Sequence, residues 1–156
     1  MSAEQHRYRL TVTWTGNRGS GTSSYRDYGR DHVIAAAGKP DIPGSSDPAF
    51  RGDAARWNPE DLLVASVSAC HKLWYLHFCS VNGIVVERYE DAAEGAMVMD
   101  KDGGGRFTAI ALKPKIWISS GDAECALKLH HDAHEKCFIA NSVNFPIGCE
   151  AEILQA

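Results

Sequence analysis

Residues 58–83 read NPEDLLVASVSACHKLWYLHFCSVNG, and this stretch carries the signals for the start, body and end of one long helix. Asn58 is a good N-cap, Pro59 suits the first helical position, and two acidic residues follow in the first turn. The Asn82-Gly83 pair predicts the end of the helix near residue 80. Because apolar residues cover most of its circumference, the helix is predicted to be buried on nearly all sides. In a chain this short, a second copy of the chain is the simplest cover, which predicts a homodimer.

Two helices are predicted to turn cysteines inward. The first carries an apolar stripe at i, i+4, i+7 and i+11 spacing, made of Leu63, Val67, Cys70 and Trp74. A second helix is predicted to open at Gly121-Asp122, with Asp122 as its cap. Its inward face comprises Ala126, Leu129, His130, Ala133 and Cys137.

Strand signals surround these helices. Before the first helix, alternation predicts a strand from Tyr8 to Trp14, and further strands are predicted over 22–28 and 32–36, followed by a long loop over 38–56. Between the helices, strands are predicted near 84–99 and 106–118, joined by a hairpin at 102–105. A last strand is predicted over 147–154. Strands gathered around two helices indicate an α+β fold, and the length of 156 residues predicts one domain over 1–156.

Composition excludes some classes of function. Sixteen basic against twenty acidic residues give a net charge of −4, and no basic stripe is present, so no nucleic-acid partner is expected. No apolar run approaches the roughly 18 residues of a membrane span, and the N-terminal residues lack the apolar core of a secretory signal. These patterns predict a cytoplasmic protein without a membrane partner. An odd count of five cysteines argues against a disulfide framework and for free thiols, metal ligands or buried cysteines.

The residues alone leave three interpretations of Cys70 and Cys137 open. Both are acceptable as small core residues, because free cysteine is among the most buried residue types. Alternatively, the spacing of His130, His134 and Cys137 permits a metal site on the second helix, with Cys70-His71 as further ligands. The third interpretation is a Cys70 nucleophile of the Cys/His hydrolase type, for which neither His71, about a quarter turn away, nor His77, about 10 Å along the helix, is a convincing base. Cys79, Cys125 and Cys149 are expected to have no chemical role, with Cys79 and Cys149 in the core.

Several stretches resemble the OsmC/Ohr family, the osmotically inducible and organic hydroperoxide resistance proteins. Residues 58–63 and 65–70 are similar to the central helix of that family, and residues 133–142 to its second cysteine region. Arg18-Gly19-Ser20-Gly21-Thr22 resembles its N-terminal turn, and Gly83-Ile84-Val85-Val86 and residues 107–114 also fit. The resemblance covers nearly the whole chain.

This resemblance implies an intertwined homodimer in which antiparallel sheets wrap long central helices. It also implies a thiol peroxidase that needs no cofactor and reduces organic hydroperoxides in oxidative stress defence, with hydrogen peroxide as a further substrate. Cys70 would be the peroxidatic cysteine and Cys137 the resolving one, with a lipoyl-type protein or a small thiol as the reductant. Arg18 would steady the thiolate and Glu60 would hold that arginine. The main alternative is a protein of this fold that binds a small ligand or thiol-reactive compound without turnover.

Physical chemistry supports the need for an arginine. Only the thiolate is nucleophilic, and Cys70 is predicted to lie roughly 15 Å from the positive end of its helix, beyond the reach of the helix dipole. An arginine suits this role because it stays charged when buried. The same separation keeps Glu60 from touching Cys70 in a regular helix. Either Arg18 spans part of the gap, or the helix is broken between them, or Glu60 acts across the dimer, which is the favoured hypothesis. Four arginines remain candidates for the activating group: Arg18, Arg30, Arg51 and Arg56.

Overall fold

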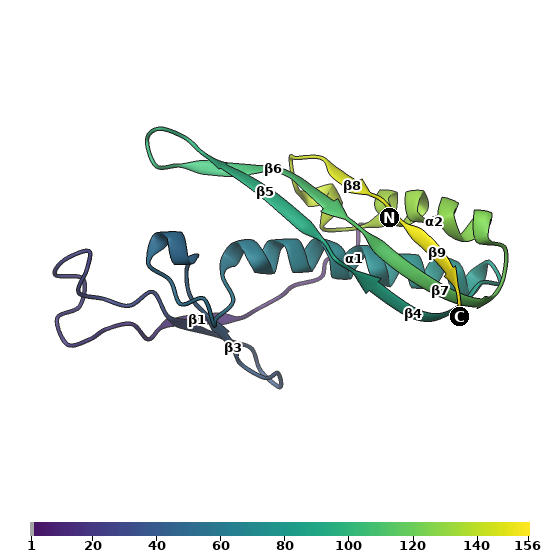
Figure 1. Cartoon of the computed structure of the whole chain (residues 1–156). Coiled ribbons are helices and arrows are strands. Elements are labelled where there is room, and N and C mark those ends of the chain that lie inside the picture. The colour runs from purple at the N-terminus through teal and green to yellow at the C-terminus, as the bar shows by residue number, and fades with distance from the viewer. Residues whose placement is uncertain (1) are drawn as a thin grey trace. The chain divides into compact units, whose positions relative to one another are not determined.

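The computed structural model describes residues 2–156, which form two compact units that divide between Leu62 and Leu63. The single domain expected over residues 1–156 stays a prediction. The elements combine helices and sheets, which confirms the α+β class. Figure 1 gives their order along the chain. Among the described residues, no helix is both long and apolar enough to cross a membrane.

The first unit is built on a three-stranded antiparallel sheet. Its strands β1 (Thr11–Trp14), β2 (His32–Ala35) and β3 (Ile42–Gly44) pair in the order β1-β2-β3, and a short 3₁₀ helix, η1 (Pro48–Phe50), follows. The strand predicted over 22–28 is wrong, because these residues form turns. The Arg30 guanidinium donates to the carbonyls of Tyr25 and Tyr28, so these two acceptors are engaged by a side chain and not by a neighbouring β-strand. The predicted loop over 38–56 is also wrong in part, since it contains β3 and η1.

Helix α1 (Pro59–Val81) has the predicted bounds to within one residue at its end. Asn58 Oδ1 accepts from the Asp61 amide at 2.8 Å, and Asp61 Oδ2 accepts from the Asn58 amide at 3.2 Å, so the two residues cap the helix reciprocally. At the other end, Gly83 adopts a φ of 72°, and the Ile84 amide donates to the Cys79 carbonyl at 3.0 Å. This left-handed glycine is the expected stop signal.

The second unit contains two three-stranded sheets and helix α2 (Ala123–Lys136). One sheet has the order β4 (Val85–Asp91), β7 (Pro114–Ser120) and β9 (Glu152–Gln155), and the other has β5 (Glu94–Met99), β6 (Gly105–Leu112) and β8 (Ile147–Cys149). Strands β8 and β9 pair parallel to β6 and β7, so the prediction of purely antiparallel sheets is wrong at these two pairs. Figure 1 shows α2 beside β8 and β9. The short 3₁₀ helix η2 (Ala140–Ser142) links α2 to β8.

Each long strand predicted in this unit is divided into two. Asp91 lies at the break after β4, where its carboxylate accepts from the Ser68 hydroxyl at 2.6 Å and from the Lys113 amide at 2.7 Å. This carboxylate therefore fixes the second break as well, because Lys113 lies between β6 and β7. The last predicted strand, 147–154, divides after Cys149 into β8 and β9.

The core of the second unit lies where α1 and α2 meet the β4-β7-β9 sheet. It contains these fully or almost fully buried residues: Tyr75, Cys79, Ile84, Ile116, Ile118, Ala126, Leu129 and Ala133. On α1 the buried residues are Val67, His71, Tyr75 and Cys79, spaced four apart. The apolar stripe predicted from the sequence is therefore rotated around the helix relative to the face that is buried. Only Val67 belongs to both, and the predicted members Cys70 and Trp74 are half-buried. This rotation turns Cys70 toward a pocket.

Candidate active site at Cys70 and Cys137

Cys70 opens onto an apolar pocket of about 380 Å³. The pocket is lined by Leu73, Trp74 and His77 of α1 together with Phe138, which follows α2. The Trp74 and Phe138 rings meet edge to face at 5.5 Å between centroids. A thiol at the wall of an apolar, accessible pocket can meet a small organic molecule, which a fully buried cysteine cannot do.

Cys137 is buried, with 1% of its surface exposed, and it caps the C-terminal end of α2. Its amide donates to the Ala133 carbonyl at 2.9 Å, and its sulfur accepts from the Ala140 amide at 3.4 Å. Burial raises the pKa of the Cys137 thiol to about 11, the Ala140 amide opposes this, and the neighbouring Cys70 side chain raises it further. The structure thus brings the side chains of Cys70 and Cys137 within interaction range.

We expect Cys137 to resist alkylation in the folded chain. With a pKa of about 11, the thiolate fraction of Cys137 at pH 7 is on the order of one in 10,000, against a few per cent for an ordinary thiol. Iodoacetamide at pH 7, followed over time by peptide mapping, should modify Cys137 at least about 100-fold more slowly in the folded chain than in urea. Equal rates in the two conditions would contradict the burial of this thiol.

The predicted arginines and Glu60 precede the division at Leu62, whereas both cysteines follow it. Arg18, Arg30 and Arg51 line a polar pocket of about 330 Å³ in the first unit. Arg56 donates to the carbonyls of Gly44 and His32, both at 2.9 Å. Glu60 lies in the first turn of α1. The roles predicted for Arg18 and Glu60 therefore stay predictions.

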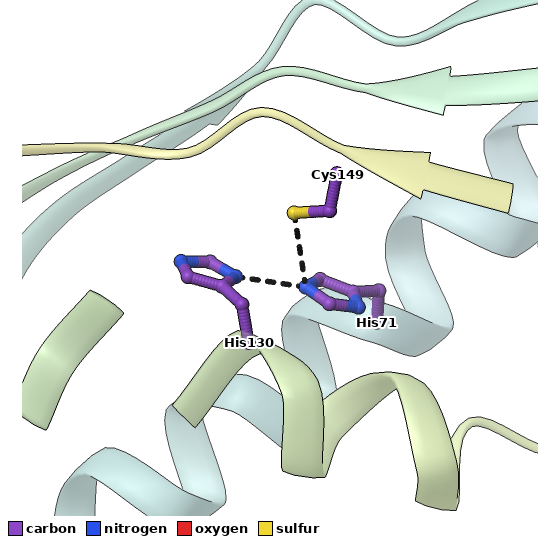
Figure 2. Close-up of side chains that lie close together, drawn as sticks. All are labelled: His71, His130 and Cys149. Carbon is purple, nitrogen blue, oxygen red and sulfur yellow. Dashed lines mark hydrogen bonds between the residues drawn. The ribbon is translucent and has the colours of Figure 1, made fainter. Parts of the chain in front are cut away.

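A second cluster, which the sequence analysis did not predict as a set, comprises His71, His130 and Cys149 (Figure 2). His71 Nε2 lies 2.9 Å from His130 Nδ1, and the Cys149 sulfur lies 4.0 Å from His71 Nε2. Burial lowers the pKa of His71 to about 4, against a smaller raising effect of Asp91, and burial and then His71 lower the pKa of His130 to about 3. Both rings are thus neutral at neutral pH.

This cluster corrects two expectations. The predicted metal-site residues His130, His134 and Cys137 are not brought together as donors, whereas His130 meets His71 and Cys149. Cys149 is exposed in this chain and does not belong to the core. The signal for His71 was present in the sequence, because His71 shares four-residue spacing with Val67 and Tyr75. Nothing in the sequence paired it with Cys149, which is 78 residues away.

Comparison with known proteins decides the family. The family model of OsmC-like proteins matches residues 52–152, which is well over half of the chain. The chain belongs to the OsmC family. A solved OsmC-like protein of unknown function from Vibrio cholerae is 30% identical to it, with a TM-score of 0.85 over 95% of this chain and 100% of that chain. No curated protein matches the sequence.

Two more distant structures share the fold of this OsmC family member. An organic hydroperoxide resistance protein from Elizabethkingia anophelis is 18% identical, with a TM-score of 0.67 over 98% of this chain and 100% of that chain. A putative organic hydroperoxide resistance protein from Vibrio cholerae, which has captopril in one of its active sites, is 21% identical, with a TM-score of 0.67 over 97% and 95%.

Proposed function

We propose that this OsmC family member is a thiol peroxidase that reduces organic hydroperoxides in the cytoplasm as part of oxidative stress defence. The observation that carries the proposal is the pairing of an accessible Cys70, at the wall of an apolar pocket, with a buried Cys137 next to it. The pocket supplies apolar surface for the organic part of a hydroperoxide, and the second thiol supplies a partner for the oxidised first one. Hydroperoxide resistance proteins of the same fold are consistent with this activity.

The proposed cycle balances with two thiols and an external dithiol. The Cys70 thiolate attacks the terminal peroxide oxygen, the O–O bond breaks, and the organic part leaves as an alcohol after taking up a proton, with Cys70 as sulfenic acid. The Cys137 sulfur then attacks the sulfenic sulfur, water leaves, and a Cys70–Cys137 disulfide forms. A dithiol, from a lipoyl-type protein or a small thiol compound, reduces the disulfide and becomes oxidised.

The burial of the two thiols supports the proposed order in which they react. Cys137 has almost no exposed surface and a raised thiol pKa, so it is a poor first nucleophile for a peroxide that arrives from solvent. Cys70 faces the pocket and is the one that a substrate reaches. Once Cys70 is oxidised, the low thiolate fraction of Cys137 matters less, because the second step joins neighbouring groups in one molecule.

The proposal includes a homodimer and an arginine. Leu73 and Phe138 on the pocket wall are 64% and 67% exposed in the single chain, and a second copy would cover such apolar surface. Arg18, held by Glu60, is proposed to stabilise the Cys70 thiolate, with Arg30, Arg51 and Arg56 as the other candidates. In the dimer, Glu60 would act on the site across the interface.

A peroxide consumption assay tests this function. With dihydrolipoamide as reductant, the purified chain is expected to consume cumene hydroperoxide in a 1:1 ratio to the dithiol, and faster than hydrogen peroxide, because the pocket around Cys70 is apolar. No consumption above the protein-free rate would overturn the proposal. If cumyl alcohol nevertheless protected Cys70 from alkylation, the alternative of a small-ligand-binding protein without turnover would be supported instead.

A further inference from the structure

Outside the proposed peroxidase site, three potential metal donors converge from three different elements. His71 comes from α1, His130 from α2 and Cys149 from the end of β8, as Figure 2 shows. Their nearest donor atoms all lie within 4.8 Å of one another. His71 and His130 are 1% and 6% exposed, so their rings are held in place by the surrounding core. Fixed donors of this kind do not have to be ordered when an ion binds.

We propose that His71, His130 and Cys149 bind a divalent metal ion of the zinc class. Two imidazole nitrogens and a thiolate are the borderline-soft ligands that zinc prefers. With Zn–N bonds of about 2.0–2.1 Å and a Zn–S bond of about 2.3 Å, neighbouring ligand atoms on a tetrahedral ion lie about 3.3–3.6 Å apart. The observed separations of 2.9 Å between the two nitrogens and 4.0 Å between sulfur and nitrogen lie on either side of that range.

Hydrogen bonding in the cluster uses one nitrogen of each histidine ring. The two rings lie nearly coplanar, with 5° between their planes, and share a single N···N hydrogen bond. His130 Nε2 is buried and has no hydrogen-bond partner among residues 2–156. Nε2 is therefore the nitrogen that would carry the ring proton of His130 when Nδ1, the nitrogen that faces His71, binds the ion.

Charge also suits a divalent cation at this place. Burial lowers the pKa of His71 and raises the pKa of the Cys149 thiol, and the Asp91 charge lies close enough to oppose the first effect and add to the second. A Cys149 thiolate together with the Asp91 carboxylate would balance two positive charges. The charge of His134 makes a smaller contribution that lowers the pKa of His71. His134 also lines the pocket beside the cluster, together with His130, His131 and Cys149. This pocket of about 370 Å³ leaves the fourth coordination position open to water or a small ligand.

Proton balance follows from the chemistry of the donors. The neutral imidazoles each keep one ring proton, which moves to the nitrogen that does not face the metal. The Cys149 thiol loses its proton to solvent, because a coordinating sulfur is deprotonated even where burial raises its pKa. Binding of one ion should therefore release one proton per chain.

Cobalt(II) is the probe for the experiment, because a thiolate bound to it gives a charge-transfer band in the near ultraviolet. The full-length chain, stripped with a chelator, is titrated with Co²⁺ and then with Zn²⁺. We expect one Co²⁺ per chain, a thiolate band, one proton released per ion, and displacement of Co²⁺ by Zn²⁺. The Cys149→Ser variant should lose the band and bind at least about 100-fold more weakly.

Matched variants separate this site from the peroxidase thiols. Cys125→Ser, Cys70→Ser and Cys137→Ser should all retain the cobalt band, because their sulfurs do not belong to the cluster. Circular dichroism of Cys149→Ser checks its fold, and Zn²⁺ should raise the melting temperature of the wild type but not of this variant. No band in the wild type, or a band that persists in Cys149→Ser, would overturn the proposal. Neither result depends on peroxide turnover.

Discussion

Replacement of Cys70 by serine is expected to lower peroxide turnover by at least about 1,000-fold, within the range of losses that follow removal of a catalytic nucleophile. A serine hydroxyl is close in shape to a thiol, so the pocket lined by Trp74 and Phe138 should keep its form. Serine nevertheless stays protonated at neutral pH and cannot store the peroxide oxygen as a sulfenic acid. Consumption of cumene hydroperoxide with dihydrolipoamide in excess measures this effect.

Cys125→Ser is the matched control for this loss. Cys125 lies in the first turn of α2, is half-buried, and belongs to neither the Cys70 pocket nor the metal cluster. Its replacement should leave turnover within about twofold of the wild type, since it touches no part of the proposed chemistry. A Cys70→Ser variant as active as Cys125→Ser would mean that another group reduces the peroxide.

Replacement of Tyr75 by alanine is expected to destabilise the fold by about 3–5 kcal/mol, as for other large buried aromatic residues. Tyr75 is 0% exposed and lies where α1 meets α2. Its ring stacks on His130 at 3.9 Å between centroids, and its hydroxyl donates to the Ala126 carbonyl at 2.9 Å. Urea unfolding at a fixed chain concentration measures the change in the free energy of unfolding.

Tyr75→Phe separates the ring of Tyr75 from its hydroxyl. It keeps the stacking on His130 and removes only the hydrogen bond to Ala126, so its expected cost is about 1 kcal/mol. A cost for Tyr75→Ala no larger than that for Tyr75→Phe would contradict the view that the aromatic ring joins the two helices.

The helices could be predicted from the sequence because their end signals are local. Asn58 caps α1 through the amide of Asp61, and Asp122 caps α2 through the amide of Cys125, as the cap residues indicate. Strand breaks could not be predicted in this way. The break at Lys113 depends on the Asp91 carboxylate, and the parallel pairing of β9 with β7 depends on where the chain returns after α2.

The candidate site could be predicted only in part. Periodicity indicated that Cys70 and Cys137 belong near the core, but apolar residues nearly all round α1 gave no sharp direction to its buried face. That face was decided by polar partners, because His71 is buried against His130 and Tyr75 donates to the backbone of α2. Contacts between residues so far apart in the sequence cannot be predicted from the local spacing of apolar residues. The position of Cys149 beside His71 is of the same kind.

The disulfide between Cys70 and Cys137 tests the central proposal most directly. The reduced wild-type chain is treated with one equivalent of cumene hydroperoxide, alkylated, digested without reductant and analysed by mass spectrometry. The account predicts a single crosslinked peptide pair that joins Cys70 to Cys137 and is absent from Cys70→Ser. A crosslink that joins other cysteines, or a wild-type chain in which both thiols remain free after the peroxide is consumed, would contradict it.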